Sequence, residues 1–178
     1  MISVSGIPGS GKSTLATALS DMLSWPVIRF DDYEALTAMH PSAVVDWLDH
    51  GAPLSDSLAP GFRQAATLAG PEAILDTPFG PLWPGLGEAI SVSVWIDCPF
   101  DIALARKLRT LAQAGTSDPG FAGWLEQWLS AYHLSTRRAY LDISERARPL
   151  VHCIVDGTRP SSDSFEDVCA HLRARQIV

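Results

Sequence analysis

The sequence predicts an α/β fold with three layers, in which a five-stranded parallel sheet lies between helices on both faces. The chain has 178 residues, 47% of them hydrophobic and 19% charged, which is the size and make-up of a single domain with a substantial core. Short apolar runs alternate along it with stretches of helical periodicity, as expected when helices connect parallel strands. Four of the five strand candidates end in an aspartate, and open α/β sheets bind their ligands beyond the carboxyl ends of the strands.

The first half of the chain supplies three of these strands. Residues 2–5 form a short apolar run that opens directly into glycines, and apolar residues then recur at helical spacing up to residue 23. A second strand is expected at residues 26–30 and a third at residues 73–75, each followed by aspartate. Helices are expected in the intervening segment, at residues 33–39, 42–50 and 59–68.

The second half adds two strands and three helices. The strands are expected at residues 90–96 and 151–155, and a helix at residues 100–111. Between residues 121 and 132, aromatic and apolar residues recur at i, i+3, i+4 and i+7, which we interpret as a helix that packs against the core, although the stripe could instead be an aromatic ligand site. In the last helix, Asp163 and Glu166 resemble a capping box.

Charge and composition exclude several classes of function. The net charge of −7 and the pI near 5.0 argue against a general nucleic-acid binder, which needs a basic surface. No apolar stretch reaches the length of a membrane span. The sequence begins MISVSG without a basic leader, and its three cysteines are too few and too scattered for a disulfide framework or a zinc site. We therefore expect a cytoplasmic protein with reduced cysteines.

A phosphate-binding motif lies between the first strand and the first helix. Residues 6–13, GIPGSGKS, match G-x-x-x-x-G-K-[ST], the P-loop or Walker A motif. Its glycines let backbone N–H groups approach a phosphate, and the following helix directs its positive N-terminus to the same point. Lys12 is expected to reach the β- and γ-phosphates, Ser13 to bind Mg²⁺, and Thr14 to contact an earlier phosphate. We therefore predict a P-loop NTPase fold with strand order 2-3-1-4-5, ATP and Mg²⁺ as cofactors, and nucleotide contacts from Gly6, Pro8, Gly9, Ser10, Gly11, Lys12, Ser13 and Thr14.

Two other P-loop classes do not fit the sequence. Residues 76–80, DTPFG, approximate the D-x-x-G switch of GTPases, but the glycine comes one residue late. The chain contains no asparagine, so the guanine-reading N-K-x-D motif cannot exist in it. Large multi-subunit ATPases usually need a longer chain. A small P-loop kinase is the interpretation that this leaves.

Several further segments resemble the small P-loop kinases of the uridine kinase, nicotinamide riboside kinase and phosphoribulokinase group. They are FDDY at 30–33, HPSA at 40–43, GAPL at 51–54, VWIDCP at 94–99, ARKLR at 105–109, Tyr140, and the Asp-Gly pair at 156–157. The resemblance covers most of the chain, but only the P-loop is a specific signal. The third strand departs from the group, because it ends in Asp76-Thr77 where the group usually has Glu-Gly.

The chemistry of phosphoryl transfer, together with this resemblance, implies roles for a few side chains. Transfer needs a group that orients the acceptor hydroxyl, and the resemblance implies a catalytic base at Asp31, although Asp31 or Asp32 could instead cap a helix. Asp76 is the candidate for holding a Mg²⁺-bound water, or else it forms the turn before residues 77–78. Tyr33 and Arg63 are candidates for contacting the acceptor.

A lid is expected around residues 106–120. Arg106 and Arg109 are three residues apart, so they share one face of a helix. They could clamp phosphates across the site, Arg106 in catalysis and Arg109 on the nucleotide, or they could belong to a solvated surface. Because residues 113–120 form a flexible tract after them, we predict poor order from about residue 107 to residue 120 in the absence of ligand.

The sequence therefore predicts an ATP-dependent kinase that transfers the γ-phosphate to a hydroxyl of a small, nucleoside- or sugar-like metabolite. Two alternatives remain open: a kinase of another acceptor class (a nucleoside monophosphate, a shikimate-like acid or an antibiotic), and a regulatory module that binds nucleotide without an acceptor. Residues 1–178 are expected to form one domain. Its partner is a small-molecule acceptor and neither nucleic acid nor membrane, and the protein is a monomer or a homodimer.

Overall fold

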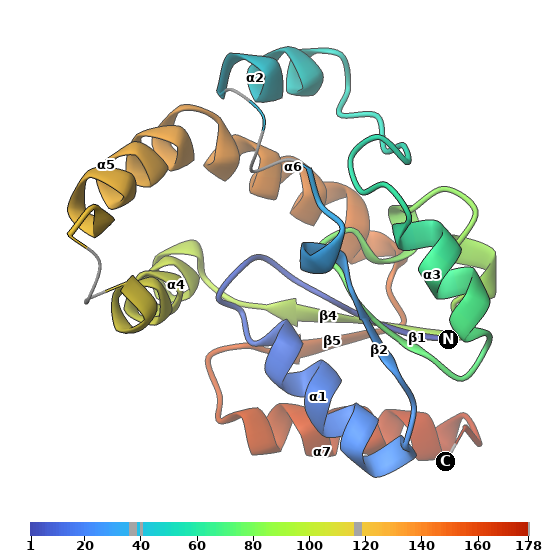
Figure 1. The fold of residues 1–178 in the computed structure, drawn as a ribbon. Helices are drawn as coiled ribbons and strands as arrows, with labels where there is room; N and C mark the ends of the chain where they lie inside the picture. Colours follow the sequence, from blue (N-terminus) through green and yellow to red (C-terminus); the bar gives the residue numbers. More distant parts are fainter. Residues whose placement is uncertain (36–38, 40, 116–118, 178) are drawn as a thin grey trace.

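A parallel sheet of five strands forms the centre of the molecule in a computed structural model that describes residues 1–35, 39, 41–115 and 119–177. The strands are β1 (Ile2–Ser5), β2 (Val27–Arg29), β3 (Ile74–Asp76), β4 (Val92–Asp97) and β5 (Cys153–Asp156). Their order is β2-β3-β1-β4-β5, and every neighbouring pair is parallel. This confirms the predicted α/β fold, and it places β1, which leads into the P-loop, in the middle of the sheet (Figure 1).

Helices cover both faces of the sheet, as Figure 1 shows. They are α1 (Lys12–Leu23), α2 (Pro41–Asp49), α3 (Phe62–Ala69), α4 (Phe100–Gly115), α5 (Phe121–Ala131), α6 (Arg137–Ala147) and α7 (Ser161–Ala174). A π-helical segment, η5 (Tyr132–Thr136), joins α5 to α6 without a break, and a short 3₁₀ turn, η1 (Phe30–Asp32), follows β2. Helices α1 and α7 lie on one face, and α3 and α6 lie on the other.

Alternation along the strands divides the core into two layers. Ile74 packs with the aliphatic residues of α1 and α7, whereas its neighbour Leu75 packs on the opposite side with α3 and α6. Successive side chains of a strand point to opposite faces, so β3 contributes to both layers. The central strands β1, β3 and β4 are almost entirely buried, whereas Ile154 on the edge strand β5 is 49% exposed.

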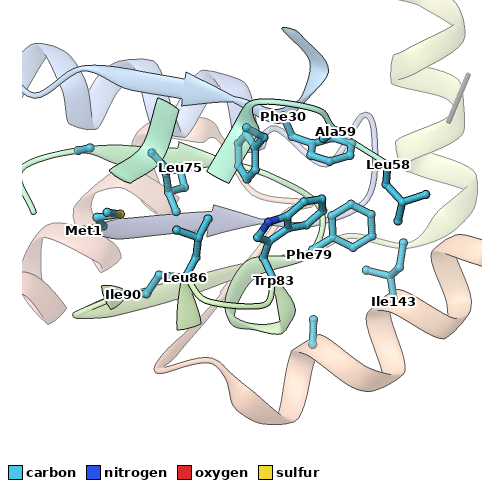
Figure 2. Packing of buried hydrophobic residues seen from close by; sticks show 14 of the residues in the cluster. Met1, Phe30, Leu58, Ala59, Leu75, Phe79, Trp83, Leu86, Ile90 and Ile143 are labelled. Atoms are coloured by element: carbon cyan, nitrogen blue, oxygen red, sulfur yellow. The ribbon is translucent and has the colours of Figure 1, made fainter. Parts of the chain in front are cut away.

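A cluster of four aromatic rings fills the α3 side beneath the carboxyl ends of β2 and β3. Phe30 lies edge-on to the rings of Phe62, Phe79 and Trp83, at centroid distances of 5.0–5.6 Å. Figure 2 shows Trp83 at the centre of this packing with Phe79 and Phe30 beside it. Such edge-to-face contacts add to the stabilisation from burial. Because Phe30 is held on three sides, the position of Asp31, the next residue, is fixed as well.

Two local predictions were wrong. Residues 33–35 form a turn and an irregular segment and do not begin a helix, while residues 36–38 and 40 lie outside the described part of the chain. Helix α7 begins at Ser161 after Pro160, so Asp163 lies in the first turn and is not the cap of a capping box. There its carboxylate favours the positive helix terminus and pairs with Arg159.

Helix α5 corrects the prediction that the aromatic stripe of residues 121–132 packs against the core. None of the described side chains of α5 is buried, and Trp124 is 46% exposed. The rings stack on one another instead, Phe121 on Trp124 and Trp128 on Tyr132. Helix α5 lies beyond α4 at the edge of the molecule (Figure 1), too far from the sheet to contribute to either layer. Periodicity identified its apolar face but could not show what that face meets.

Candidate functional site

The P-loop joins β1 to α1 and is shaped by glycines. Gly9 has φ +87° and Gly11 has φ +106°, a backbone region that other residues rarely adopt. A Cβ at Gly9 would lie 2.0 Å from the carbonyl oxygen of Ala103, so α4 packs directly on the loop only because residue 9 has no side chain. No side chain caps the N-terminus of α1, which leaves its first N–H groups available to an anion.

A buried ion pair lies at the end of this loop. Lys12 Nζ is 3.9 Å from Asp76 Oδ1, and the two side chains are only 8% and 4% exposed. The β1–β3 register sets Val4 opposite Asp76, so the topology itself brings the carboxylate to the P-loop. Asp76 Oδ1 has no hydrogen-bond partner among the described residues. A buried, unpartnered carboxylate oxygen is costly, so this atom fits a site that holds a cation or a cation-bound water.

The electrostatics of Asp76 agree with this interpretation. Burial raises the pKa of Asp76, while Lys12 and a hydrogen bond from Ser13 lower it. The negative charge of Asp31 raises it further, and Arg29 opposes that effect. Burial is the largest of these effects, so the pocket disfavours the free carboxylate and would gain from a bound cation. A cation near Asp76 would also lie within reach of the Ser13 hydroxyl.

Asp31 follows β2 on the exposed turn η1, at the same edge of the sheet as Asp76, where the parallel strands end. Its charge acts on Asp76 and also on the hydroxyl of Tyr140 in α6, whose pKa is raised mainly by burial and then by Asp31. The charge of Asp31 is therefore felt at both Asp76 and Tyr140. Asp32 is also exposed, but it is not among the groups that shift either pKa.

Two predicted acceptor contacts are engaged elsewhere. The Tyr33 ring packs on Phe62 with centroids 6.0 Å apart, and so contributes to the aromatic cluster. The Arg63 guanidinium donates hydrogen bonds from Nε and Nη2 to the Asp56 carboxylate, at 3.1 and 2.5 Å. Both side chains are about half exposed. This places Arg63 on the outer surface of α3 with its charge already paired.

The two lid arginines do not form a clamp in this structure. Arg106 Nη1 donates a 2.6 Å hydrogen bond to the carbonyl oxygen of Gly157, which ties α4 to the loop after β5. Arg109 is exposed one turn further along α4. Residues 107–115 continue this helix, and residues 116–118 of the predicted lid lie outside the described part of the chain.

An aromatic wall lies beside the P-loop, and sequence reasoning found two of its residues, Trp128 and Tyr132, but favoured core packing for them over a ligand site. Trp128, Tyr132 and Tyr140 line a small cavity that Ile7, Pro8 and several residues of α4 also line. Tyr140 also belongs to the packing of α6, and its spacing from Ile143 and Ala147 marks the inward face of that helix. That spacing can be seen in the sequence. It does not show which residues of this face contact the core and which contact the P-loop.

Comparisons with known proteins place the fold. No protein-family model matches the chain, and no curated protein matches it by sequence. Among solved structures, a sugar kinase from a Janibacter species is 13% identical, with 97% of this chain and 93% of that chain covered and a TM-score of 0.50. A shikimate kinase from Bacteroides thetaiotaomicron is 15% identical, with 97% of each chain covered and a TM-score of 0.50. A shikimate kinase from Aquifex aeolicus is 18% identical over 99% of this chain and 98% of that one, with a TM-score of 0.49.

At these identities the likeness shows the fold alone: a three-layer P-loop architecture that spans nearly the whole chain. Two further observations bear on the site. The described residues contain no group of three or more His, Cys, Asp or Glu side chains placed to hold a metal ion. Within the same residues, no helix has the length and apolar character that crossing a membrane requires.

Proposed function

We propose that this protein is an ATP- and Mg²⁺-dependent small-molecule kinase, which transfers the γ-phosphate of ATP to a hydroxyl group. One observation carries the proposal. The buried Asp76 Oδ1, without a hydrogen-bond partner in the described structure, lies 3.9 Å from Lys12 at the end of a glycine-shaped loop. A free anion-binding loop next to an unsatisfied carboxylate suits a phosphate and its cation together.

Different groups of the chain are proposed to bind the phosphates and the Mg²⁺ ion. Backbone N–H groups of residues 9–13 and the Lys12 ammonium hold the phosphates, and the close packing of α4 on Gly9 keeps the loop rigid. Ser13 and Asp76 fit Mg²⁺, Ser13 through its hydroxyl and Asp76 through a bound water. The ion would neutralise charge on the phosphates. Arg109 remains a proposed nucleotide contact, and Arg106, held by Gly157 O, would act from the base of the lid.

Asp31 is the proposed general base. It is exposed to the cleft, and its charge reaches both Asp76 and Tyr140, so an acceptor placed among these groups would lie next to it. The hydroxyl proton passes to the Asp31 carboxylate as the acceptor oxygen bonds to the γ-phosphorus and the bond from that phosphorus to the ADP oxygen breaks. A base in this position typically contributes ~10²–10⁴-fold to the rate.

Two further lines support a kinase. The chain shares its architecture with solved structures described as a sugar kinase and a shikimate kinase. The sequence also resembles the uridine kinase-like group at the P-loop and at residues 30–33. We therefore place the protein among small P-loop kinases with an alcohol acceptor, acting in the cytoplasm as a monomer or a homodimer.

The experiment that tests this function measures ATP consumption against a pool of small metabolites, with and without Mg²⁺. The wild-type protein is expected to form ADP only when Mg²⁺ is present, and faster when its acceptor is in the pool. Lys12→Ala should abolish both ATP binding and turnover. Tight ATP binding with no turnover on any pool would instead support a nucleotide-binding regulatory module. No ATP binding at all would exclude both functions.

A further inference from the structure

Resting on the proposed kinase activity, the geometry points to the class of acceptor: an uncharged or cationic alcohol that presents an apolar or aromatic face. Phosphorylated and carboxylated acceptors are disfavoured. Two independent features carry this inference. One is the aromatic wall beside the P-loop, and the other is the distribution of charged side chains around Asp31.

The aromatic wall consists of Trp128, Tyr132 and Tyr140. Trp128 and Tyr132 stack at a centroid distance of 5.6 Å with their planes 16° apart, and Tyr132 meets Tyr140 at 6.3 Å. All three line a cavity that Ile7 and Pro8 of the P-loop and several residues of α4 also line. The Tyr140 hydroxyl lies within the electrostatic reach of Asp31, so the wall connects directly to the proposed base.

The wall can move to admit an acceptor. The cavity measures about 10 Å³, room for roughly one water molecule, so an acceptor must part the wall from the P-loop. Helix α5 carries Trp128, and none of its described side chains is buried, so few packing contacts resist that movement. Stacked rings that close on a ligand favour a flat or apolar face in it.

The charged side chains near Asp31 disfavour an anionic acceptor. Residues 30–105 contain a single lysine or arginine, Arg63, and Asp56 already holds it. Three carboxylates, Asp31, Asp32 and Glu34, occupy the turn after β2. Arg29, just before the turn, donates a hydrogen bond to Thr17 Oγ1. An acidic acceptor would therefore meet mainly like charges, whereas an amine would be attracted.

The arginines of α6 and the turn after it are also engaged. Arg138 pairs with Asp49, Arg146 with Asp142, and Arg148 with Asp97, and Arg137 lies over the Phe100 ring. Lys107 is the one cation that lines the cavity. It extends from α4, which packs on the P-loop at Gly9, and we assign its charge to the phosphates of ATP and not to the acceptor.

Three matched probes test the proposal: benzyl alcohol, its para-aminomethyl derivative and its para-carboxy derivative. They are compared as acceptors for Mg²⁺-dependent ADP formation. We expect the neutral and cationic probes to raise ADP formation above the rate with water alone. Their kcat/KM should exceed that of the carboxylate by at least about tenfold, the effect of ~1.4 kcal/mol. An equal or better carboxylate, or no stimulation by any probe, overturns the proposal.

Variants of α5 test the wall itself. Trp128→Ala should raise the KM of the neutral probe by roughly tenfold, since an aromatic pair contributes about 0.5–1.5 kcal/mol beyond burial. Trp124→Ala is the matched control, because Trp124 is on the same helix but does not line the cavity, and it should leave KM unchanged. Equal changes of KM in both variants would contradict the proposal that the acceptor contacts the aromatic wall. Mg²⁺-dependent ADP formation with the metabolite pool separates a wrong acceptor class from a wrong function, since turnover with the pool persists in the first case and is absent in the second.

Discussion

Asp31 and Asp32 are neighbours on one exposed turn, yet only Asp31 is among the groups that shift the pKa of Asp76 and of Tyr140. We predict that Asp31→Asn lowers turnover by at least ~10²-fold, because the proton acceptor is lost, while ATP binding changes little. Asp32→Asn is the control and should be the milder change. Steady-state kinetics on a working acceptor, together with calorimetric ATP binding, measure both effects. Near-normal turnover of the Asp31→Asn variant would show that Asp31 is not the general base.

Gly9 and Gly11 offer a second comparison between single residues. Both have positive φ, but a Cβ at Gly9 would lie 2.0 Å from Ala103 O, whereas nothing lies within 4 Å of one at Gly11. Gly11→Ala should cost about 1–2 kcal/mol of unfolding free energy from backbone strain alone. Gly9→Ala should cost more, because α4 must also move away from the loop. Urea unfolding without nucleotide measures the difference, and equal losses would show that α4 does not constrain the loop.

Between elements, the contact of β4 with the start of β5 is sensitive to pH. The Nδ1 atom of His152 accepts a hydrogen bond from the backbone N–H of Ser93, which requires that this nitrogen carry no proton. Burial lowers the pKa of His152, and Arg175 and His171 lower it further. The neutral imidazole is therefore favoured in the folded state. Its contribution to stability is complete above the unfolded pKa of about 6.5 and is lost as pH falls through the lower folded value.

We predict that His152→Asn flattens the decline in unfolding free energy on the acid side of pH ~6.5. The asparagine oxygen can accept the same hydrogen bond but does not titrate. Urea denaturation of both proteins across this range checks the prediction. Parallel pH profiles would show that His152 contributes nothing to the acid sensitivity.

At the same scale, the sequence allowed some elements to be predicted and not others. The strands followed from apolar runs that alternate with helical stretches, and their order followed from the P-loop fold that residues 6–13 imply. The predicted capping box was wrong because α7 begins at Ser161, after the N-cap Pro160, two residues before Asp163. The role of α5 could not be predicted, because periodicity gives the direction of an apolar face but not the distance to the core. The partners of Arg63 and Arg106 depend on rotamers and loop positions that no local pattern encodes.

For the whole molecule, ligand binding and stability are linked. The native protein keeps a buried, unpartnered carboxylate oxygen at Asp76 and an uncapped helix terminus at α1, and Mg²⁺ with ATP would satisfy both. Bound ligand at a hundredfold excess over Kd should add about 2.7 kcal/mol to the unfolding free energy. Thermal unfolding with ATP, with Mg²⁺ and with both measures this. The largest shift is expected with both together in the wild type and no shift in Lys12→Ala; equal shifts in the two proteins would place the nucleotide elsewhere.

The most direct test of the account follows the fate of the γ-phosphate by phosphorus NMR, with Mg²⁺, ATP and the neutral benzyl alcohol probe or a metabolite pool. A kinase with Asp31 beside its acceptor must form a phosphomonoester in the same amount as ADP. That signal should be absent in Lys12→Ala and much slower to appear in Asp31→Asn. Release of inorganic phosphate alone, or ATP that stays intact while bound, would contradict the transfer of phosphate to an alcohol.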